Sequence, residues 1–177
     1  WKKAKELAPE LNFPVNVGDV LEAVMQNPIT GLPSGSDIND HLRQLLYQKE
    51  WTVLKVRIDH LDSFYDHYGI TAGDAILLFT ASILMNAMSQ AKTEKDFIGH
   101  TVQNRFIVIT SSVDKAEAIR KQSVEAFGGQ VGDHYPFKDR EEGYKKVPLM
   151  SLRISMVTAD DGPFSDLPEL AEEIARA

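Results

Sequence analysis

Residues 51–79 read WTVLKVRIDHLDSFYDHYGITAGDAILLF, and this stretch decides the fold. Apolar and polar side chains alternate over residues 52–59, which is typical of a strand with one face in a core. The core face carries Thr52, Leu54, Val56 and Ile58. The other face carries Val53, Lys55, Arg57 and Asp59. The pattern therefore predicts a strand that buries one side and keeps charges on the other.

The second half of this stretch predicts two helices with glycines between them. A short helical segment is expected near residues 61–67, after which Gly69 and Gly73 interrupt the pattern. Asp74 is then expected to open a longer helix that runs through about residue 88, because Asp is favoured where helices begin.

Outward from this stretch, periodicity and turn residues predict the other elements. These are a helix capped by Ser36 or Asp37, strands over 96–101 and 105–110, a helix over 114–127, a strand over 147–158 and a helix over 167–177. Residues 128–146 are polar and are expected to form a long excursion. Helices that alternate with strands in this way predict an α/β domain with one sheet and helices packed against it.

The composition sets limits on the class of protein. The chain has 177 residues, 43% of them hydrophobic and 25% charged, which suits one globular domain. The net charge of −7 gives no basic surface for nucleic acid, and the absence of cysteine excludes disulfides and thiolate metal sites. We expect no membrane span and a cytoplasmic location. The chain starts at Trp1 and not at methionine, so we interpret it as a piece of a longer protein.

Three separated segments carry a family pattern. They are Asn27-Pro28-Ile29-Thr30-Gly31-Leu32-Pro33-Ser34, the stretch from Ile58 to Leu77 with its Asp-His-Tyr-Gly and Gly-Asp, and Leu152-Arg153-Ile154-Ser155-Met156. Together they resemble the GGDEF family, the diguanylate cyclases that condense two GTP into cyclic di-GMP. The resemblance implies a palm or ferredoxin-like, antiparallel-rich sheet flanked by helices over residues 27–177. Residues 1–26 would then be a connector or the tail of an upstream domain, with an extra helix on the same core as the alternative.

The family signature is degenerate in this chain. It falls on Val102-Gln103-Asn104-Arg105-Phe106, where only Phe106 agrees with the family. In the family the glycines let the hairpin approach the triphosphate, and an acidic side chain in the turn helps to hold Mg²⁺. Val102 is β-branched and tolerates positive φ poorly, and Asn104 has no charge. The family's first strand aspartate aligns with Arg57, which offers a metal no lone pair. We therefore expect no catalytic residue, no metal site and no cofactor.

The nucleotide site is only partly kept. The family reads guanine with an asparagine, here Tyr65, and an aspartate, here Asp74. The family's inhibitory product site falls on Thr93-Glu94-Lys95-Asp96 and keeps only its aspartate. Asp74, Arg57 and Asp59 are the candidate nucleotide-binding residues. The plain alternatives are a capping role for Asp74, a carboxylate partner on the same strand face for Arg57, and a solvated or paired acid for Asp59.

Other polar residues receive structural interpretations. We expect His60, His67 and His100 to be surface residues, because they lie on different elements without the spacing of metal ligands. Residues 134–146 are expected to form a mobile solvated loop, with a partner-binding loop as the alternative.

The leading functional prediction is a catalytically inactive GGDEF-like module of a bacterial signal-transduction protein. It would act through a protein partner or by dimerising, beside a sensor or a response-regulator receiver domain. The alternative is a non-catalytic sensor of GTP, cyclic di-GMP or a related nucleotide. A third hypothesis is an active cyclase with a rebuilt metal site.

Overall fold

The computed structural model describes residues 26–90, 93–94 and 96–177. Four strands form one antiparallel sheet in the order β2-β3-β1-β4. They are β1 (Thr52–Asp59), β2 (Phe97–His100), β3 (Arg105–Thr110) and β4 (Ser151–Thr158). With helices between β1 and β2 and between β3 and β4, the connectivity is ferredoxin-like. The predicted α/β class and antiparallel sheet are confirmed, whereas most of the proposed connector, residues 1–25, lies outside the described residues.

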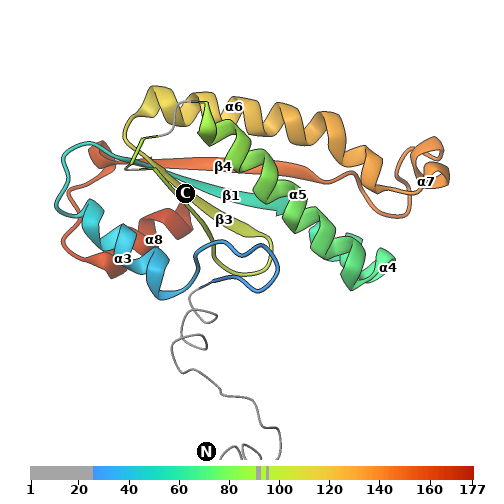
Figure 1. The fold of residues 1–177 in the computed structure, drawn as a ribbon, viewed down its shortest axis with the longest axis horizontal. Helices are drawn as coiled ribbons and strands as arrows, with labels where there is room; N and C mark the ends of the chain where they lie inside the picture. Colours follow the sequence, from blue (N-terminus) through green and yellow to red (C-terminus); the bar gives the residue numbers. More distant parts are fainter. Residues whose placement is uncertain (1–25, 91–92, 95) are drawn as a thin grey trace, which may run out of the picture.

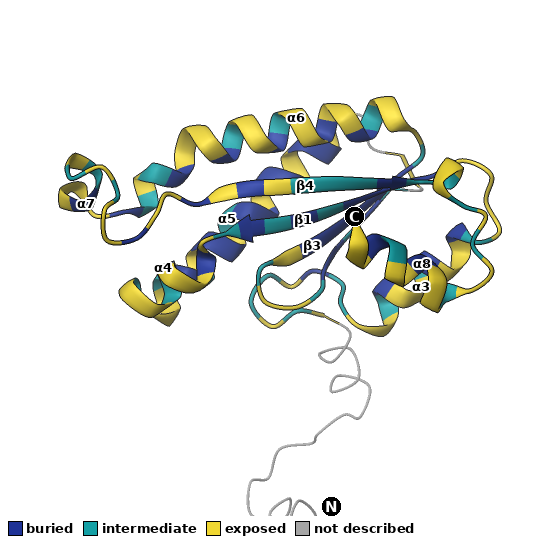
Figure 2. Ribbon diagram, turned by 180° about the vertical axis from the view of Figure 1, so that it is seen from behind, coloured by how far each residue is buried: buried dark blue, intermediate teal, exposed yellow. Residues whose placement is uncertain are grey.

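One face of the sheet is covered by three helices, α4 (Leu61–Tyr68), α5 (Ile70–Ser89) and α6 (Val113–Gln130) (Figure 1). The predicted core side of β1 faces them, because Leu54, Val56 and Ile58 are fully buried in the hydrophobic core on this side. Figure 2 shows buried residues along the strands and on the inward sides of these helices. The alternation of side chains along β1 therefore predicted correctly which face of the strand is buried.

The other face carries α3 (Ser36–Leu45) and α8 (Leu167–Arg176), which enclose a second hydrophobic core. Val53 belongs to this core, but the more polar residues that follow it on β1 lie toward the far end of the strand. The Arg57 side chain there is 40% exposed. This end of the face is therefore exposed to solvent.

Helix α5 begins at Ile70, directly after Gly69 at φ 88°. The prediction that Asp74 opens this helix is wrong, since Asp74 lies inside it. Gly73 is helical, and a Cβ there would lie 2.5 Å from Cζ of Tyr65. The glycine is thus needed for a close contact and does not break the helix. Helix α5 is long and apolar enough to span a membrane by length and composition alone, a test that the core helix of a globular domain also passes.

Helix α3 forms in the predicted region, but its predicted cap is wrong. The N-cap residue is Gly35, and no side chain caps the helix. The strands predicted over 96–101 and 105–110 are confirmed as the β2–β3 hairpin.

The excursion after α6 is ordered and packed. Helix α6 continues to Gln130 and is followed by the 3₁₀ turn η1 (Val131–His134) and helix α7 (Phe137–Glu141). The Tyr135 side chain is buried, and its hydroxyl donates to the carbonyl of Pro148 at 2.8 Å. The prediction of a mobile solvated loop over 134–146 is wrong, because aromatic residues tie this segment to the core.

A second contact fixes the same segment to α4. The hydroxyl of Tyr68 donates to the Asp139 carboxylate at 2.5 Å. This hydrogen bond, with smaller contributions from Lys146 and His67, lowers the pKa of Asp139. Asp139 is therefore held as an acceptor that joins α7 to α4.

Candidate functional site

The turn that joins β2 to β3 is held in place by His100. Nε2 of His100 lies 2.7 Å from the backbone carbonyl of Gln103, and Nδ1 lies 3.0 Å from Oγ1 of Thr30. A carbonyl only accepts, so Nε2 carries the proton and neutral Nδ1 accepts from the Thr30 hydroxyl. Gln103 has φ 49°, a left-handed conformation that is uncommon for a non-glycine residue. The bond from His100 helps to stabilise this conformation.

His100 itself is buried and stacks on Phe106 with ring centroids 4.2 Å apart. Burial lowers the pKa of His100, although the bond to Gln103 acts in the opposite direction. The prediction of a surface histidine is wrong for His100, while His60 and His67 are exposed as predicted.

Asn104 joins the turn to β1 by two hydrogen bonds. Its side-chain Nδ2 donates to the carbonyl of Ile58 at 2.8 Å, and its own carbonyl accepts from the Ile58 amide at 3.1 Å. The Asn104 side chain is therefore already engaged with the backbone of the neighbouring strand.

Arg57, Asp59 and Arg153 form a charged group at the open end of the sheet. Nε and Nη2 of Arg57 lie 3.0 Å and 2.8 Å from Oδ1 of Asp59, and Nη2 of Arg153 lies 2.9 Å from Oδ2. The predicted partner for Arg57 on its own strand face is confirmed as Asp59. The Asp59 carboxylate is 15% exposed and is shared by two arginines.

Asp74 lies in a pocket on the other side of the hairpin. This open pocket of about 540 Å³ is also lined by Tyr65, Asp66, His100 and Gln103. The Tyr65 hydroxyl donates to Oδ1 of Asp74 at 2.6 Å. Burial, followed by the hydrogen bond and the charge of Asp74, raises the pKa of Tyr65 far above its ordinary value. One oxygen of Asp74 is thus already used by the protein.

Asp96 takes part in a buried ion pair with Lys115 on α6. Its side chain is fully buried, and the backbone N–H of Thr93 donates to it at 2.7 Å. Burial alone would raise the pKa of Asp96, but the bonds from Lys115 and Thr93 outweigh it and hold the pKa below its ordinary value. Asp96 therefore has a structural role between the β2 segment and α6.

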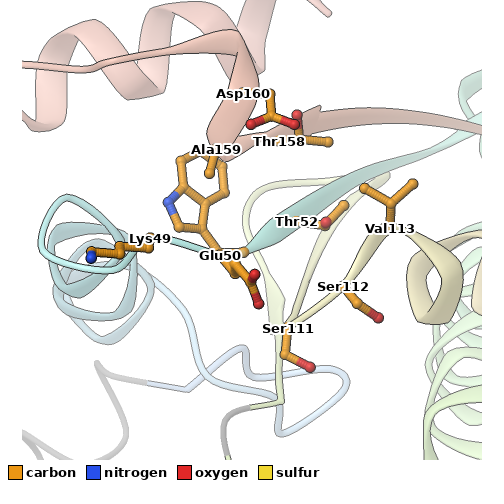
Figure 3. A pocket seen from close by; sticks show the side chains of 10 residues that line it. Lys49, Glu50, Thr52, Ser111, Ser112, Val113, Thr158, Ala159 and Asp160 are labelled. Atoms are coloured by element: carbon orange, nitrogen blue, oxygen red, sulfur yellow. The ribbon is translucent and has the colours of Figure 1, made fainter.

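A further pocket lies at the opposite end of the strands, among Trp51, Thr52, Ser111, Ser112 and Thr158 (Figure 3). Thr52 and Arg57 are five residues apart on β1, which corresponds to about 17 Å. This pocket contains none of the predicted site residues.

The family model described as "Diguanylate cyclase, GGDEF domain" matches residues 24–174. The chain belongs to the GGDEF family. This GGDEF domain therefore belongs to a family of cyclic di-GMP signalling, and the resemblance noted in its sequence is confirmed. The degeneracy of its signature stays a prediction.

Solved structures agree with this assignment. The coiled coil and GGDEF domain of DgcB from Caulobacter crescentus, in complex with c-di-GMP, aligns with a TM-score of 0.70 and 13% identity, over 99% of this chain and 86% of that chain. The GGDEF domain of YfiN from Pseudomonas aeruginosa gives a TM-score of 0.64 and 18% identity, over 84% of this chain and 88% of that chain. At identities this low, the likeness shows the shared fold alone. A comparison with curated proteins gave no match.

A diguanylate cyclase of the same fold, SiaD from Pseudomonas aeruginosa, has been crystallised with its activator SiaC. It aligns with a TM-score of 0.62 and 14% identity, over 99% of this GGDEF domain and 62% of the SiaD chain.

The magnesium ion that the family implies does not fit the residues of this GGDEF domain. Mg²⁺ prefers carboxylate and phosphate oxygens. The two aligned metal positions hold a guanidinium, Arg57, and an amide, Asn104, whose nitrogen is bonded to Ile58. The carboxylate that contacts Arg57, Asp59, is bound by two arginines. Within residues 26–90, 93–94 and 96–177, no group of three or more His, Asp or Glu side chains is arranged to hold a metal.

The candidate nucleotide residues fall into two separate places. Asp74 lines the pocket beside Tyr65, whereas Arg57 lines a pocket on the face of α8. The β2–β3 hairpin contributes Gln103 to the first and Arg105 to the second. Sequence reasoning missed His100 and Arg153. The alternation of side chains along residues 151–158 could have placed Arg153 on the polar face of a strand. No sequence pattern indicated a role for His100.

Proposed function

We propose that this GGDEF domain is a catalytically silent signalling module that acts through a protein partner or through self-association. One observation carries the proposal. The two positions that the family uses for its metal hold Arg57 and Asn104, and each is bound to a group of the protein itself.

The chemistry of phosphoryl transfer explains why these residues matter. Attack of a ribose hydroxyl on a nucleoside triphosphate develops negative charge that metal ions normally neutralise. Arg57 adds a positive charge to the site but cannot bring in a metal or accept a proton, since a guanidinium stays protonated. Asn104 offers at most a neutral carbonyl oxygen, because its amide nitrogen faces Ile58.

A role in binding agrees with what is known of a relative. SiaD is a diguanylate cyclase crystallised with a protein activator, so this fold can present a surface to a partner. We propose the same kind of interaction here, in a cytoplasmic protein where the domain lies next to a sensor or receiver domain.

The test is an assay of the purified chain with GTP and either Mg²⁺ or Mn²⁺, with nucleotides separated by chromatography. An active diguanylate cyclase in parallel serves as the positive control. We expect no cyclic di-GMP above the protein-free blank. Sustained product formation from GTP would overturn the proposal.

A second candidate is a nucleotide sensor, favoured by the pocket of about 540 Å³ beside Asp74. Thermal unfolding with GTP, GDP and cyclic di-GMP tests it. A nucleotide held at about 100 times its dissociation constant adds about 2.7 kcal/mol of stability. A shift with GTP that Asp74→Ala removes would support a sensor. If no nucleotide shifts the melting temperature, the partner-binding module remains as the proposed function.

A further inference from the structure

Three arginines stand side by side across the sheet at its open end. Arg57 on β1 is paired in register with Arg105 on β3 and with Arg153 on β4. Residues that are directly opposite in an antiparallel sheet point to the same face, and like charges in such positions repel. We call Arg105, Arg57 and Arg153 the arginine row. Its members line one pocket with Lys55.

The charges around the arginine row do not balance. Lys55 adds a fourth positive charge on the same face, whereas Asp59 is the carboxylate that contacts Arg57 and Arg153. Counted over side chains alone, four positive charges and one negative charge leave an excess of three on a protein whose net charge is −7. In the described part of the chain, no salt bridge includes Arg105.

Asp59 occupies only some of the N–H donors of Arg57 and Arg153, so the arginine row keeps donors for a ligand. Nζ of Lys55 donates to the backbone oxygen of Ala175 at 2.9 Å and to that of Ala177 at 2.6 Å, so Lys55 is directed at the end of α8. Burial, and then repulsion from Arg105 and Arg57, lowers the pKa of Lys55. The Arg57 and Arg153 side chains are 40% and 67% exposed, and the pocket between them measures about 320 Å³. Solvent therefore reaches the guanidinium groups.

We infer that the arginine row binds the phosphoryl groups of a small anion directly, without a divalent cation. Guanidinium groups match phosphate oxygens with paired N–H donors and carry a permanent charge. An anion in this pocket would offset the excess of positive charge that Asp59 leaves. The inference goes beyond the proposed function, because it requires neither a protein partner nor a reaction.

Isothermal titration of the 177-residue chain with inorganic pyrophosphate, in low salt with EDTA, tests this inference. We expect saturable binding that weakens as salt is added, because exposed charges are screened. Added Mg²⁺ should leave the affinity unchanged or lower it, since Mg²⁺ competes for the same phosphate oxygens. Binding that requires Mg²⁺ would overturn the inference, as would no binding at millimolar pyrophosphate.

Arg105→Ala is the decisive variant, because no salt bridge of the described residues depends on Arg105. We expect it to weaken pyrophosphate binding by about tenfold or more, as for loss of a charged hydrogen bond. Arg43→Ala is the matched control, since Arg43 is an exposed arginine paired with Asp40 on α3. Equal affinities for the two variants would overturn the inference, provided that their melting temperatures are alike.

The same titration with GTP and ATP identifies the source of the phosphate. Equal affinities for GTP, ATP and pyrophosphate would mean that only phosphoryl groups are recognised. Tighter binding of GTP would mean that the pocket beside Asp74 also takes part. Both results support the inference if Arg105→Ala weakens binding. Neither titration result depends on cyclic di-GMP synthesis. A failure of the arginine row to bind phosphate can therefore be distinguished from a failure of the proposed function.

Discussion

The side-chain amide of Asn104 donates a 2.8 Å hydrogen bond to the backbone carbonyl of Ile58. This contact joins the hairpin turn to β1 at the position where the family carries an acidic residue. A carboxylate there would face the carbonyl oxygen with no proton to donate. The asparagine therefore stabilises the fold at a position where a metal ligand would have to point away from Ile58.

Asn104→Ala is expected to lower the free energy of unfolding by about 1 kcal/mol, through loss of this half-buried bond. Urea denaturation measures the change. Asn39→Ala on the exposed surface of α3 is the control, and it should leave stability unchanged or raise it slightly, because Ala favours helices. Similar losses in both variants would mean that the Asn104 bond contributes nothing specific.

Asp96→Asn is expected to destabilise the fold by about 3 kcal/mol, because it leaves the charge of Lys115 without a buried partner. Thermal or urea unfolding measures this loss. Asp40→Asn serves as the control. Asp40 and Arg43 form an exposed pair, and such pairs contribute less than about 1 kcal/mol. If the Asp96 variant is no less stable than the Asp40 variant, the ion pair is not a structural element.

Stability is expected to fall as the pH drops below about 6.5, the ordinary pKa of histidine. Burial lowers the pKa of His100, so below this pH the unfolded chain takes up a proton that the folded chain does not. The folded state loses stability until the pH reaches the lowered pKa. His134, whose pKa burial also lowers, contributes to the same slope.

Urea denaturation at several pH values between 5 and 8 measures this slope for the parent chain, His100→Gln and His134→Gln. The slope should be reduced in each variant, even if the absolute stability of His100→Gln is lower. An unchanged slope in His100→Gln would show that His100 does not carry the effect.

Tyr65→Phe removes the hydroxyl that donates to Asp74 and keeps the ring that packs on Gly73. We expect a loss of about 1 kcal/mol in unfolding free energy. Tyr47→Phe is the control, because the Tyr47 side chain is 90% exposed. The Tyr65 variant should also bind GTP more tightly if Asp74 contacts the base. Unaltered GTP binding would mean that Asp74 does not take part in nucleotide recognition.

The elements of the fold were predictable where local periodicity decides them. Residues 52–59 alternate so regularly that the strand, its core face and the partner of Arg57 all followed from the sequence. The start of α5 was predicted too late, because Gly73 was interpreted as a helix breaker. Gly73 is instead required by its close contact with the ring of Tyr65, a tertiary contact that leaves no signal in the local sequence.

The candidate site was less predictable, because it depends on pairing between distant strands. Arg57, Arg105 and Arg153 are visible in the sequence, but only the register of β1 with β3 and β4 brings them together. The burial of His100 likewise depends on Thr30 and Phe106, which come from a loop and another strand. Sequence spacing contains no information on such contacts.

The position of Arg153 has a consequence for the solubility of the protein. Among the strands of the described residues, β4 is the last on its side of the sheet, and an open strand edge is a template for a strand of another molecule. The Arg153 side chain on β4 is 67% exposed and extends the positive charge of Arg57 to that edge. A second copy that paired through its own β4 would bring further arginines against these. The sheet therefore resists edge-to-edge aggregation on this side.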